Sequence, residues 1–413
     1  MRTELVDAVV GGESLGHEVA EQLTRLGPFG LGNPGVRLLV PGAKLTDVRP
    51  MGEGDRHARF SLASGSARAL GVAFGVNGEL DAAAQDGPVD VSVKLELNEW
   101  NGAVEPRVVL GGLYPHPATD PAVPGSEAGG AAGIGEQEFW RRHDAELGRD
   151  LAEWPPPVAL VAAAEAGERE RLDRRSASGV ATIAALASSG AGVLVVCADA
   201  PRRRELVERA ARPARFGGGE FAIVSGRLGD APHAAERVRA TGSGVVLADW
   251  AALGRDPSLA AGFEHVVVVD PAPYAHLEAL AGAGEGYAHR VDGQPEIDFA
   301  LRVHADEWPS RASLGALYRA LREHCSDGAL QAAAARSLLC GEGRRHPLSP
   351  EVAARSARVL GELGLLEWSG SGVARSLRVV SSGGTDLERS NAFVAYRDRC
   401  EEGRRFLSEQ RQN

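Results

Sequence analysis

A stretch rich in proline, glycine and alanine, residues 114–135, divides this chain into parts of different sequence texture. It reads YPHPATDPAVPGSEAGGAAGIG and has no hydrophobic period, which is typical of a flexible linker. Before it, short runs alternate apolar and polar residues. After it, apolar runs alternate with helix-like segments. A chain of 413 residues with this texture can bury more than one hydrophobic core, so we expect several domains.

The runs before the linker predict a small β-barrel. Glycine, aspartate and asparagine separate the runs, which are residues 36–40, 57–63, 67–74, 89–97 and 104–113. Five short strands in about 75 residues favour the five-stranded nucleic-acid-binding barrel called the OB-fold, and a small β sandwich is the alternative. We therefore expect a leading helix and turn in residues 1–35 and a barrel in residues 36–113.

The last two runs form a predicted hairpin, LELNEWNGAVEPRVVL at residues 95–110. Asn101-Gly102 supplies the positive backbone angles of a tight turn. Trp100 lies at the tip, where its ring can either pack on the hairpin or stack on a ligand.

Residues 136–309 predict a parallel α/β domain. Their nearly continuous apolar runs are typical of strands covered on both faces, and they lie at residues 192–198, 221–224, 244–247 and 266–269. A phosphate-binding loop of the form G-x-x-x-x-G-K-[ST] needs a lysine. The two lysines of the chain, Lys44 and Lys94, each precede leucine, so we expect a scaffold or docking module and no NTPase.

Residues 310–413 predict a winged-helix domain with a closing helix. Helical segments at 313–325, 329–340 and 351–366 precede a hairpin at 367–380, and a last helix follows at 386–410. The net charge of the chain is -11, but residues 310–413 contain 16 arginines against 12 acidic residues. Arginines around the third helix and the wing would suit contacts to a DNA backbone.

Other classes of site receive no support from the sequence. The four cysteines are far apart and lack a C-x-x-C pair, so neither a zinc site nor a disulfide framework is indicated. The chain has no apolar run of about 18 residues, and we expect a cytoplasmic protein without a membrane span. We expect no cofactor in this chain.

Three segments resemble the single-stranded-DNA-specific exonuclease family RecJ. They are LGPFGLGNP at residues 26–34, MGEG at 51–54 and LELNEWNG at 95–102. VLVVCADAPRRRELVERA at 193–210 is similar to a strand and helix of a helicase's second RecA-like lobe, and TDLERSN at 385–391 is similar to the end of RecJ chains. The resemblance implies an OB domain, a helicase-lobe-like α/β domain and a winged-helix-like tail.

The resemblance also implies what the chain does and lacks. RecJ degrades single-stranded DNA 5′→3′ in repair and recombination, with a nuclease domain that uses Mn²⁺ or Mg²⁺. The D-H-H and G-G-x-x-H motifs of that domain do not occur in this sequence. The chain is therefore similar to a carboxy-terminal portion of RecJ, a DNA-binding and docking region without nuclease activity of its own. Single-strand-binding protein or a RecQ-like helicase are the implied protein partners, and a free-standing protein adaptor is the alternative.

The candidate DNA-binding residues are cations, aromatics and amides in the barrel and arginines in the tail. Such residues stack on bases or contact phosphates. An asparagine that caps a turn and an arginine on an ordinary surface are the simpler alternatives. The candidates in the barrel part are Phe29, Arg56, His57, Arg59, Asn98, Trp100, Asn101 and Arg107. Those in the tail are Arg344, Arg345, Arg355, Arg358, Arg375 and Arg378.

Overall fold

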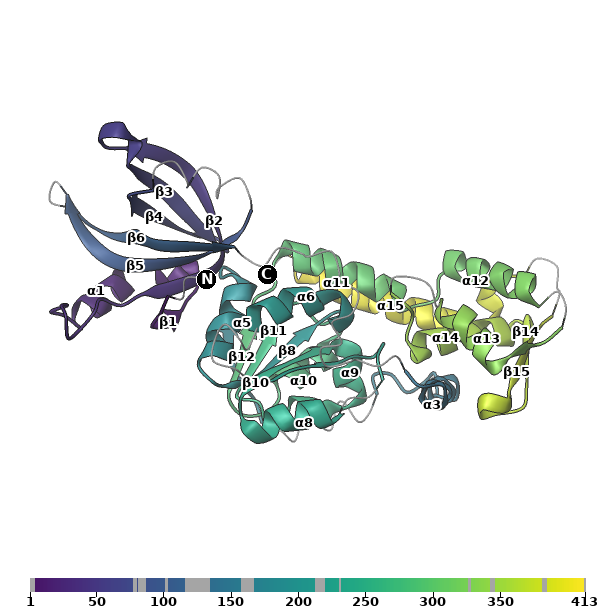
Figure 1. Ribbon diagram of the computed structural model, residues 1–413. Helices are drawn as coiled ribbons and strands as arrows, with labels where there is room; N and C mark the ends of the chain where they lie inside the picture. Colours follow the sequence, from purple (N-terminus) through teal and green to yellow (C-terminus); the bar gives the residue numbers. More distant parts are fainter. Residues whose placement is uncertain are drawn as a thin grey trace.

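The structure, a computed structural model, places a barrel at one end, a parallel sheet in the middle and a group of helices at the other end (Figure 1). It describes residues 4–76, 80, 87–100, 103–115, 134–156, 167–211, 220–229, 232–325, 328–341, 346–380 and 385–411. Most of the predicted linker, residues 116–133, lies outside the described residues.

Five of the described strands close an OB-like barrel. In chain order they are β2 (Leu38–Met51), β3 (His57–Ser64), β4 (Ala67–Phe74), β5 (Val89–Trp100) and β6 (Ala103–Pro115). Neighbours pair in the order β2-β3-β4-β6-β5, and β5 pairs with β2 to close the barrel. The β4–β6 pair is parallel and the other pairs are antiparallel. Strand alternation in the sequence thus predicted the barrel.

The first barrel strand is longer than its apolar run predicted. β2 continues beyond Val40 to Met51, and its pairing register shifts between Val40 and Ala43 and again between Thr46 and Arg49. Gly42 and Asp47 adopt positive φ angles of 62° and 52° at these irregularities. Such bulges bend a strand, which lets β2 pair with β5 at its start and with β3 at its end.

Short elements before the barrel pack against it. They are β1 (Ala8–Val9), the 3-10 helix η1 (Gly12–Ser14) and α1 (His17–Thr24), and η2 (Glu53–Asp55) follows later in the β2–β3 connection. β1 pairs in parallel with β2. Leu15 and Ala20 of this leading segment are buried in the barrel core together with Phe60 and Leu62.

The central sheet contains six described parallel strands in the order β7-β12-β11-β8-β10-β9. Their bounds are β7 (Glu170–Asp173), β8 (Gly192–Cys197), β9 (Glu220–Val224), β10 (Gly244–Asp249), β11 (His265–Val268) and β12 (Tyr287–Arg290). The helices between and after them are α5 (Gly179–Ser188), α6 (Ala200–Ala211), α8 (Pro232–Thr241), α9 (Trp250–Arg255), η3 (Pro257–Ala260), α10 (Ala275–Gly282) and α11 (Gln294–Asp306).

Side-chain alternation in β8 shows how both faces of this sheet are buried. Val193 and Val195 pack in one core with residues of α5 and α6, such as Ile183 and Val207. Leu194 and Val196 belong to a second core, which includes side chains of α8, α9 and α10. This two-sided burial explains why the strands have continuous apolar runs in the sequence.

The carboxy-terminal part combines helices with a small antiparallel sheet. Its elements are α12 (Arg311–His324), β13 (Leu330–Gln331), α13 (Ala332–Cys340), α14 (Pro350–Glu362), β14 (Leu366–Ser369), η4 (Gly372–Ala374), β15 (Ser376–Val379), η5 (Leu387–Arg389) and α15 (Asn391–Glu409). The described strands pair in the order β13-β15-β14. Its buried side chains are continuous with the second core of the parallel sheet.

Two helices join the carboxy-terminal part to the rest of the chain. α15 runs back along α11 toward the parallel sheet, and α3 (Glu136–Leu147) lies against α14 (Figure 1). The sequence grouped residues 136–147 with the α/β domain. In the structure, the buried face of α3 packs mainly on the carboxy-terminal elements.

The barrel contacts the α/β domain through the β3–β4 turn. Ser66 donates from its backbone N–H (2.9 Å) and its hydroxyl (2.7 Å) to the carbonyl of Ser176, in the loop between β7 and α5. Val9, Leu39 and Ala184 form a small apolar cluster between β1, β2 and α5. Within the described residues, no helix combines the length and apolar character needed to cross a membrane.

Candidate functional site

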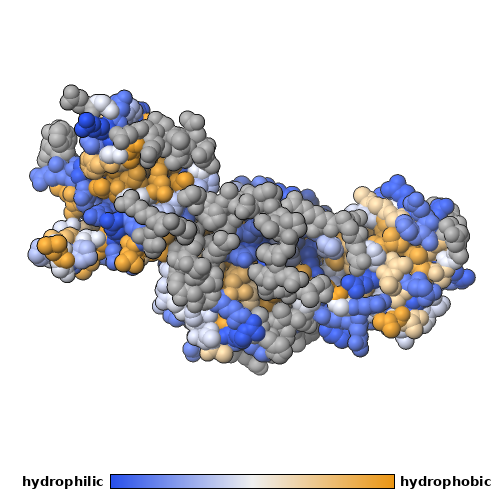
Figure 2. Space-filling model, viewed as in Figure 1, coloured by the Kyte–Doolittle hydropathy of each residue, from blue (hydrophilic) through white to orange (hydrophobic). Residues whose placement is uncertain are grey.

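The outer face of β3 and β4 is the most distinctive surface of the barrel. In β3, Ala58, Phe60 and Leu62 point inward and are buried, so the alternation turns His57 and Arg59 outward. In β4, Leu70 and Phe74 point outward and are 67% and 55% exposed. In Figure 2, apolar residues gather on the part of the barrel that faces the viewer. Large apolar side chains on an outer face commonly mark a contact surface.

Gly71 explains why the larger apolar residues of β4 point outward. A Cβ atom at Gly71 would lie 2.4 Å from the ring of Phe60, so the inner side of β4 must be narrow at this position. The inner positions Gly71 and Ala73 are accordingly small, and the Phe60 ring fills the space that they leave. The amino-acid alternation alone did not show which side of β4 faces the core.

A row of residues in register crosses this outer face. Arg49 of β2 pairs with Arg59 of β3, Arg59 with Val72 of β4, Val72 with Val109 of β6, and Val109 with Lys94 of β5. Arg49, Arg59 and Lys94 are exposed. Like charges directly opposite each other weaken a strand pair by a few tenths of a kcal/mol up to about 1 kcal/mol. The opposed Arg49 and Arg59 side chains therefore lower the stability of the free barrel, and a bound anion would reduce their repulsion.

His57 and Phe74 form an aromatic pair next to this row. Their ring centroids are 5.3 Å apart with an interplanar angle of 73°, an edge-to-face contact. The Gly75 backbone N–H donates to Nδ1 of His57 (3.2 Å), which fixes the imidazole ring. The pair therefore presents a partly exposed, oriented aromatic surface beside two guanidinium groups.

The other described candidates of the barrel part are dispersed. Arg56 is exposed in the β2–β3 connection, before β3 begins, and Phe29 is 45% exposed in the loop after α1. Arg107 donates from Nε to Glu96 on the neighbouring strand (3.2 Å), so its charge is partly neutralised. Asn98 is half-buried in β5, opposite Glu105.

Four candidates lie wholly or in part outside the described residues. The side chain of Trp100 and the whole of Asn101 lie outside the described residues, and so do Arg344 and Arg345. The hairpin that holds Trp100 does form, since β5 and β6 pair up to Trp100 and Ala103.

Two arginines of the tail are used inside the protein, contrary to the expectation that they contact DNA. Arg355 donates from Nε to Glu146 of α3 (2.8 Å), and its guanidinium lies 4.3 Å from the centroid of the Trp308 ring. Arg375 is buried, donates from Nη1 to Asp144 (2.8 Å) and covers the Trp140 ring. Their ion pairs attach α3 to α14 and to the residue that precedes β15. The two guanidinium groups are therefore used inside the protein and not at its surface.

The other two described candidates of the tail, Arg358 and Arg378, also have partners within the chain. Arg358 donates to the carbonyl of Arg149 (2.7 Å) and to Glu362 (3.3 Å), and Arg378 pairs with Glu367 across the β14–β15 hairpin while staying exposed. α14, the third helix of the predicted winged-helix domain, is buried over most of its length between α3, α13 and α15. It is therefore not free to enter a DNA groove.

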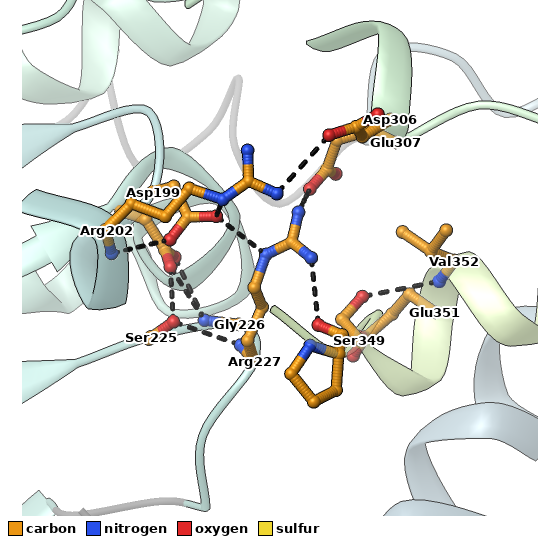
Figure 3. A network of polar contacts seen from close by, with 12 residues as sticks. Asp199, Arg202, Ser225, Gly226, Arg227, Asp306, Glu307, Ser349, Glu351 and Val352 are labelled. Atoms are coloured by element: carbon orange, nitrogen blue, oxygen red, sulfur yellow. Dashed lines mark hydrogen bonds and ion pairs between the residues drawn. The ribbon is translucent and has the colours of Figure 1, made fainter. Parts of the chain in front are cut away.

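Charged side chains join the carboxyl edge of the parallel sheet to the helices beyond it (Figure 3). Arg227, after β9, contacts Asp199 from Nε (3.1 Å) and donates from Nη1 to the Pro347 carbonyl (3.0 Å). Asp249 accepts hydrogen bonds from the hydroxyl of Ser225 and the N–H of Gly226, and burial raises its pKa. Much of the edge where parallel α/β domains commonly bind ligands thus serves internal docking.

Metal and thiol chemistry receive no geometric support in the described part of the chain. It contains no group of three or more histidine, cysteine, aspartate or glutamate side chains placed to hold a metal ion. Burial raises the pKa of the Cys197 and Cys400 thiols, which disfavours the reactive thiolate.

Comparison with known proteins shows that the barrel segment matches a known domain family. The RecJ OB domain family matches residues 6–111. The single-stranded-DNA-specific exonuclease RecJ of Bacillus subtilis (strain 168) is 31% identical over 106 residues, which are 25% of this chain and 13% of that protein. Two solved structures of RecJ from Thermus thermophilus, in complex with Mn²⁺ and with Mg²⁺, are 18% identical with a TM-score of 0.24. They match 85% of this chain and 34% and 36% of their own chains.

These matches cover much less than two thirds of each relative. Within this chain, the RecJ OB match extends over β1 to β6, the segment that contains the Arg49–Arg59 pair and the His57–Phe74 pair. Residues 6–111 match the RecJ OB domain family, and the chain is related to RecJ through this segment.

Proposed function

We propose that this chain is a single-stranded DNA-binding and docking region of the RecJ type, without a nuclease centre of its own. The observation that carries the proposal is the outer face of β3 and β4. There, a partly exposed aromatic pair adjoins Arg59, which lies opposite Arg49 of the neighbouring strand β2, on a barrel that matches the RecJ OB domain family. OB-folds bind unpaired strands by stacking bases on aromatic rings and by placing cations along the phosphates.

In this proposal each part of the face has a separate role. Phe74, oriented by His57, stacks with a base, while Arg49 and Arg59 contact successive phosphates and relieve their mutual repulsion. Leu70, four residues before Phe74 on the same outer side of β4, adds exposed apolar surface farther along the strand. None of these contacts distinguishes one base from another, so we expect little sequence preference.

We further propose that the other two parts are a RecA-like domain and a winged-helix-like domain that dock proteins. The parallel sheet and its flanking helices support the first assignment. The order α12, β13, α13, α14, β14, β15 supports the second. Because α14 and its arginines are engaged internally, we expect the winged-helix-like part to contact proteins in preference to duplex DNA. Single-strand-binding protein or a RecQ-like helicase in the cytoplasm are the proposed partners.

Catalysis is not part of the proposed function. The sequence lacks the D-H-H motif and a phosphate-loop lysine. In the structure, Ser66 of the barrel forms a hydrogen bond to the carbonyl of Ser176 in the β7–α5 loop. Incubation of the purified chain with labelled single-stranded DNA and Mn²⁺, and separately with ATP, should give no degradation and no hydrolysis. A rate well above that of a buffer control in either assay would overturn this part of the proposal.

A protein-only adaptor is the second candidate. The net charge of -11 and the internal use of Arg355 and Arg375 favour it. Fluorescence anisotropy with a labelled oligonucleotide at two salt concentrations separates the candidates. Salt-sensitive binding to single strands supports the DNA-binding region, while absent binding or binding without salt dependence supports the adaptor.

A further inference from the structure

The outward side chains of β2, β3 and β4 form four rows across the barrel wall. Residues that lie opposite each other in antiparallel strands point to the same face of the sheet, so the pairing register defines each row. In order along β3, the four rows are Met51–His57–Phe74, Arg49–Arg59–Val72, Thr46–Ser61–Leu70 and Lys44–Ala63–Arg68. The aromatic pair and the opposed arginines belong to the first two rows, and the fourth row contains two further cations.

Lys44 and Arg68 of the fourth row are exposed and are not neutralised by described neighbours. They flank Ala63 in the register, and no hydrogen bond or ion pair joins either side chain to another described residue. No position of the four rows holds a carboxylate, and Asp47 lies beside them in the bulge next to Thr46. Cations therefore predominate on this face, although the net charge of the chain is -11.

The third row separates the two cationic rows with small hydroxyl groups and an apolar side chain. Leu70 is 67% exposed there, on the same side of β4 as Phe74. A polymer that fits this pattern has to present anionic groups and flat apolar groups together. An unpaired nucleic-acid strand does so, because its bases are free to contact side chains while its phosphates meet cations. A duplex keeps the faces of its bases stacked inside.

The length of the four rows suits several nucleotides. Phe74 and Arg68 are six residues apart on β4, which is about 20 Å at roughly 3.4 Å per strand residue. One strand of a stacked helix carries a phosphate about every 3.4 Å, so this length corresponds to about six nucleotides, and to fewer if the strand is extended. OB-folds cover roughly 4–16 nucleotides.

The fourth row lies beside the contact between the barrel and the α/β domain. Ser64 and Ala67 are the last pair before the β3–β4 turn, and Ser66 of that turn donates to the carbonyl of Ser176 (2.7 Å). A strand that crosses the fourth row therefore reaches the junction of the two domains.

We propose that Lys44 and Arg68 form a second row of phosphate contacts, so that an unpaired strand lies along β3 and β4 from Phe74 to the β3–β4 turn. This inference rests on the proposed function, because it assumes that the outer face of β3 and β4 binds single strands. It adds the path of the strand, two binding residues and a preference for unpaired over duplex nucleic acid.

Anisotropy titrations of the full chain at several salt concentrations test the second row, with a labelled oligothymidine of about twelve nucleotides, which is longer than the four rows. The double variant Lys44→Gln, Arg68→Gln should reduce the magnitude of the slope of log affinity against log salt by about 1.4, since each lost phosphate contact accounts for about 0.7. The matched control is Arg25→Gln, Arg311→Gln, which removes the same charge from two exposed arginines outside the four rows. The control should leave the slope unchanged.

Leu70→Ser tests the apolar contact between the two cationic rows. It should weaken binding about threefold or more without changing the salt slope, because it removes apolar surface and no charge. A duplex of the same length should bind at least roughly tenfold more weakly than the single strand, since its bases cannot reach Phe74 and Leu70. Thermal unfolding of each variant checks that it is folded.

The possible results separate this inference from the proposed function. If the original chain binds the single strand in a salt-dependent way and the Lys44→Gln, Arg68→Gln variant has the slope of the control, the second row is refuted and the proposed function stands. Equal affinity for the duplex and the single strand would refute the strand path and indicate a general polyanion surface. Absence of binding by the original chain would overturn both proposals.

Discussion

Phe74 is the residue on which the proposed stacking contact depends. Its ring is more than half exposed, it contacts His57 edge-on, and the small inner positions Gly71 and Ala73 turn it outward. Exposure of a phenylalanine on a regular strand costs hydrophobic stability, so this placement calls for a compensating role.

Replacing Phe74 by alanine should weaken binding of single-stranded DNA by about 1–3 kcal/mol, the usual value of one stacked base. Phe74→Tyr keeps an aromatic ring and should bind like the original protein. Val373→Ala, an exposed apolar residue of η4 far along the chain, is the control for a general loss of apolar surface. Anisotropy titrations at constant salt measure all three, and equal affinities for Phe74→Ala and the control would refute the stacking role.

Substitution of Arg59 by glutamine should increase the stability of the barrel and weaken its binding to DNA. Arg59→Gln removes the repulsion from Arg49, so the free energy of unfolding should rise by a few tenths of a kcal/mol. The same change removes a phosphate contact. The negative slope of log affinity against log salt should therefore decrease in magnitude by about 0.7. Arg171→Gln, on the exposed edge strand β7, should leave the slope unchanged. An unchanged slope in Arg59→Gln would exclude Arg59 from the interface.

At the scale of elements, side-chain periodicity predicted those strands and helices whose burial is regular. Strands β3, β4, β5 and β6 begin and end within a few residues of their predicted bounds, and so does β8. β7 (ERLD) and β12 (YAHR) were missed because short strands with charged residues carry no apolar run. The continuation of β2 was missed because Pro41-Gly42 signals a turn, whereas here it marks a bend within a strand.

The tail arginines show what local sequence cannot reveal. Arg355 and Arg375 have the spacing of a basic surface, but their partners Glu146 and Asp144 lie more than 200 residues away on α3. Whether an arginine faces solvent or a distant helix depends on tertiary packing, which the helical pattern of residues 351–366 does not contain. The sequence likewise assigned no face of β4 to the core, since the close approach of Gly71 to Phe60 decides which side points inward.

The attachment of α3 should depend on pH through Asp144. Burial alone would raise the pKa of Asp144, but hydrogen bonds from Arg375 and His143 and their charges lower it overall. A carboxyl group with a lowered pKa contributes its full stabilisation above the unfolded pKa of about 4 and loses it as the pH falls further. We therefore expect Asp144→Asn to destabilise the protein by about 1 kcal/mol at pH 7, since its partly exposed ion pair is screened by solvent.

The difference in unfolding free energy between Asp144→Asn and the original protein should shrink toward zero as the pH falls below 4. Chemical denaturation at a series of pH values, followed by tryptophan fluorescence, measures it. Glu401→Gln removes the exposed pair with Arg404 and should show a smaller difference at pH 7. A pH-independent difference for Asp144→Asn would contradict the assigned ion pair.

At the scale of the whole molecule, the barrel is fixed to the α/β domain by backbone contacts at the β3–β4 turn. Gly65 has a φ of 62°, and a Cβ atom there would lie 2.7 Å from the backbone of Ser176, Ala177 and Ser178. Because this turn joins the two strands of the proposed DNA face, the contact sets the orientation of that face relative to the sheet. Such a contact is not visible in the sequence, where Gly65-Ser66 is an ordinary turn.

Gly65→Ala should separate the barrel from the α/β domain without unfolding it. Gly75→Ala is the matched control, since Gly75 also has a positive φ, of 72°, but no atom lies within 4 Å of its Cβ position. Both variants carry similar backbone strain of about 1 kcal/mol, and Gly65→Ala alone creates the clash. Small-angle scattering should show a larger maximum dimension for Gly65→Ala, and identical profiles for both variants would contradict the docking contact.

The account as a whole depends on the barrel face binding unpaired DNA. The most direct test is anisotropy of a labelled single-stranded oligonucleotide with the full chain and with the double variant Arg59→Gln, Phe74→Ala, at low and at moderate salt. We predict binding that weakens as salt rises and that the double variant largely abolishes while its unfolding transition is retained. Absence of binding by the original chain, or equal binding by the double variant, would contradict the central claim.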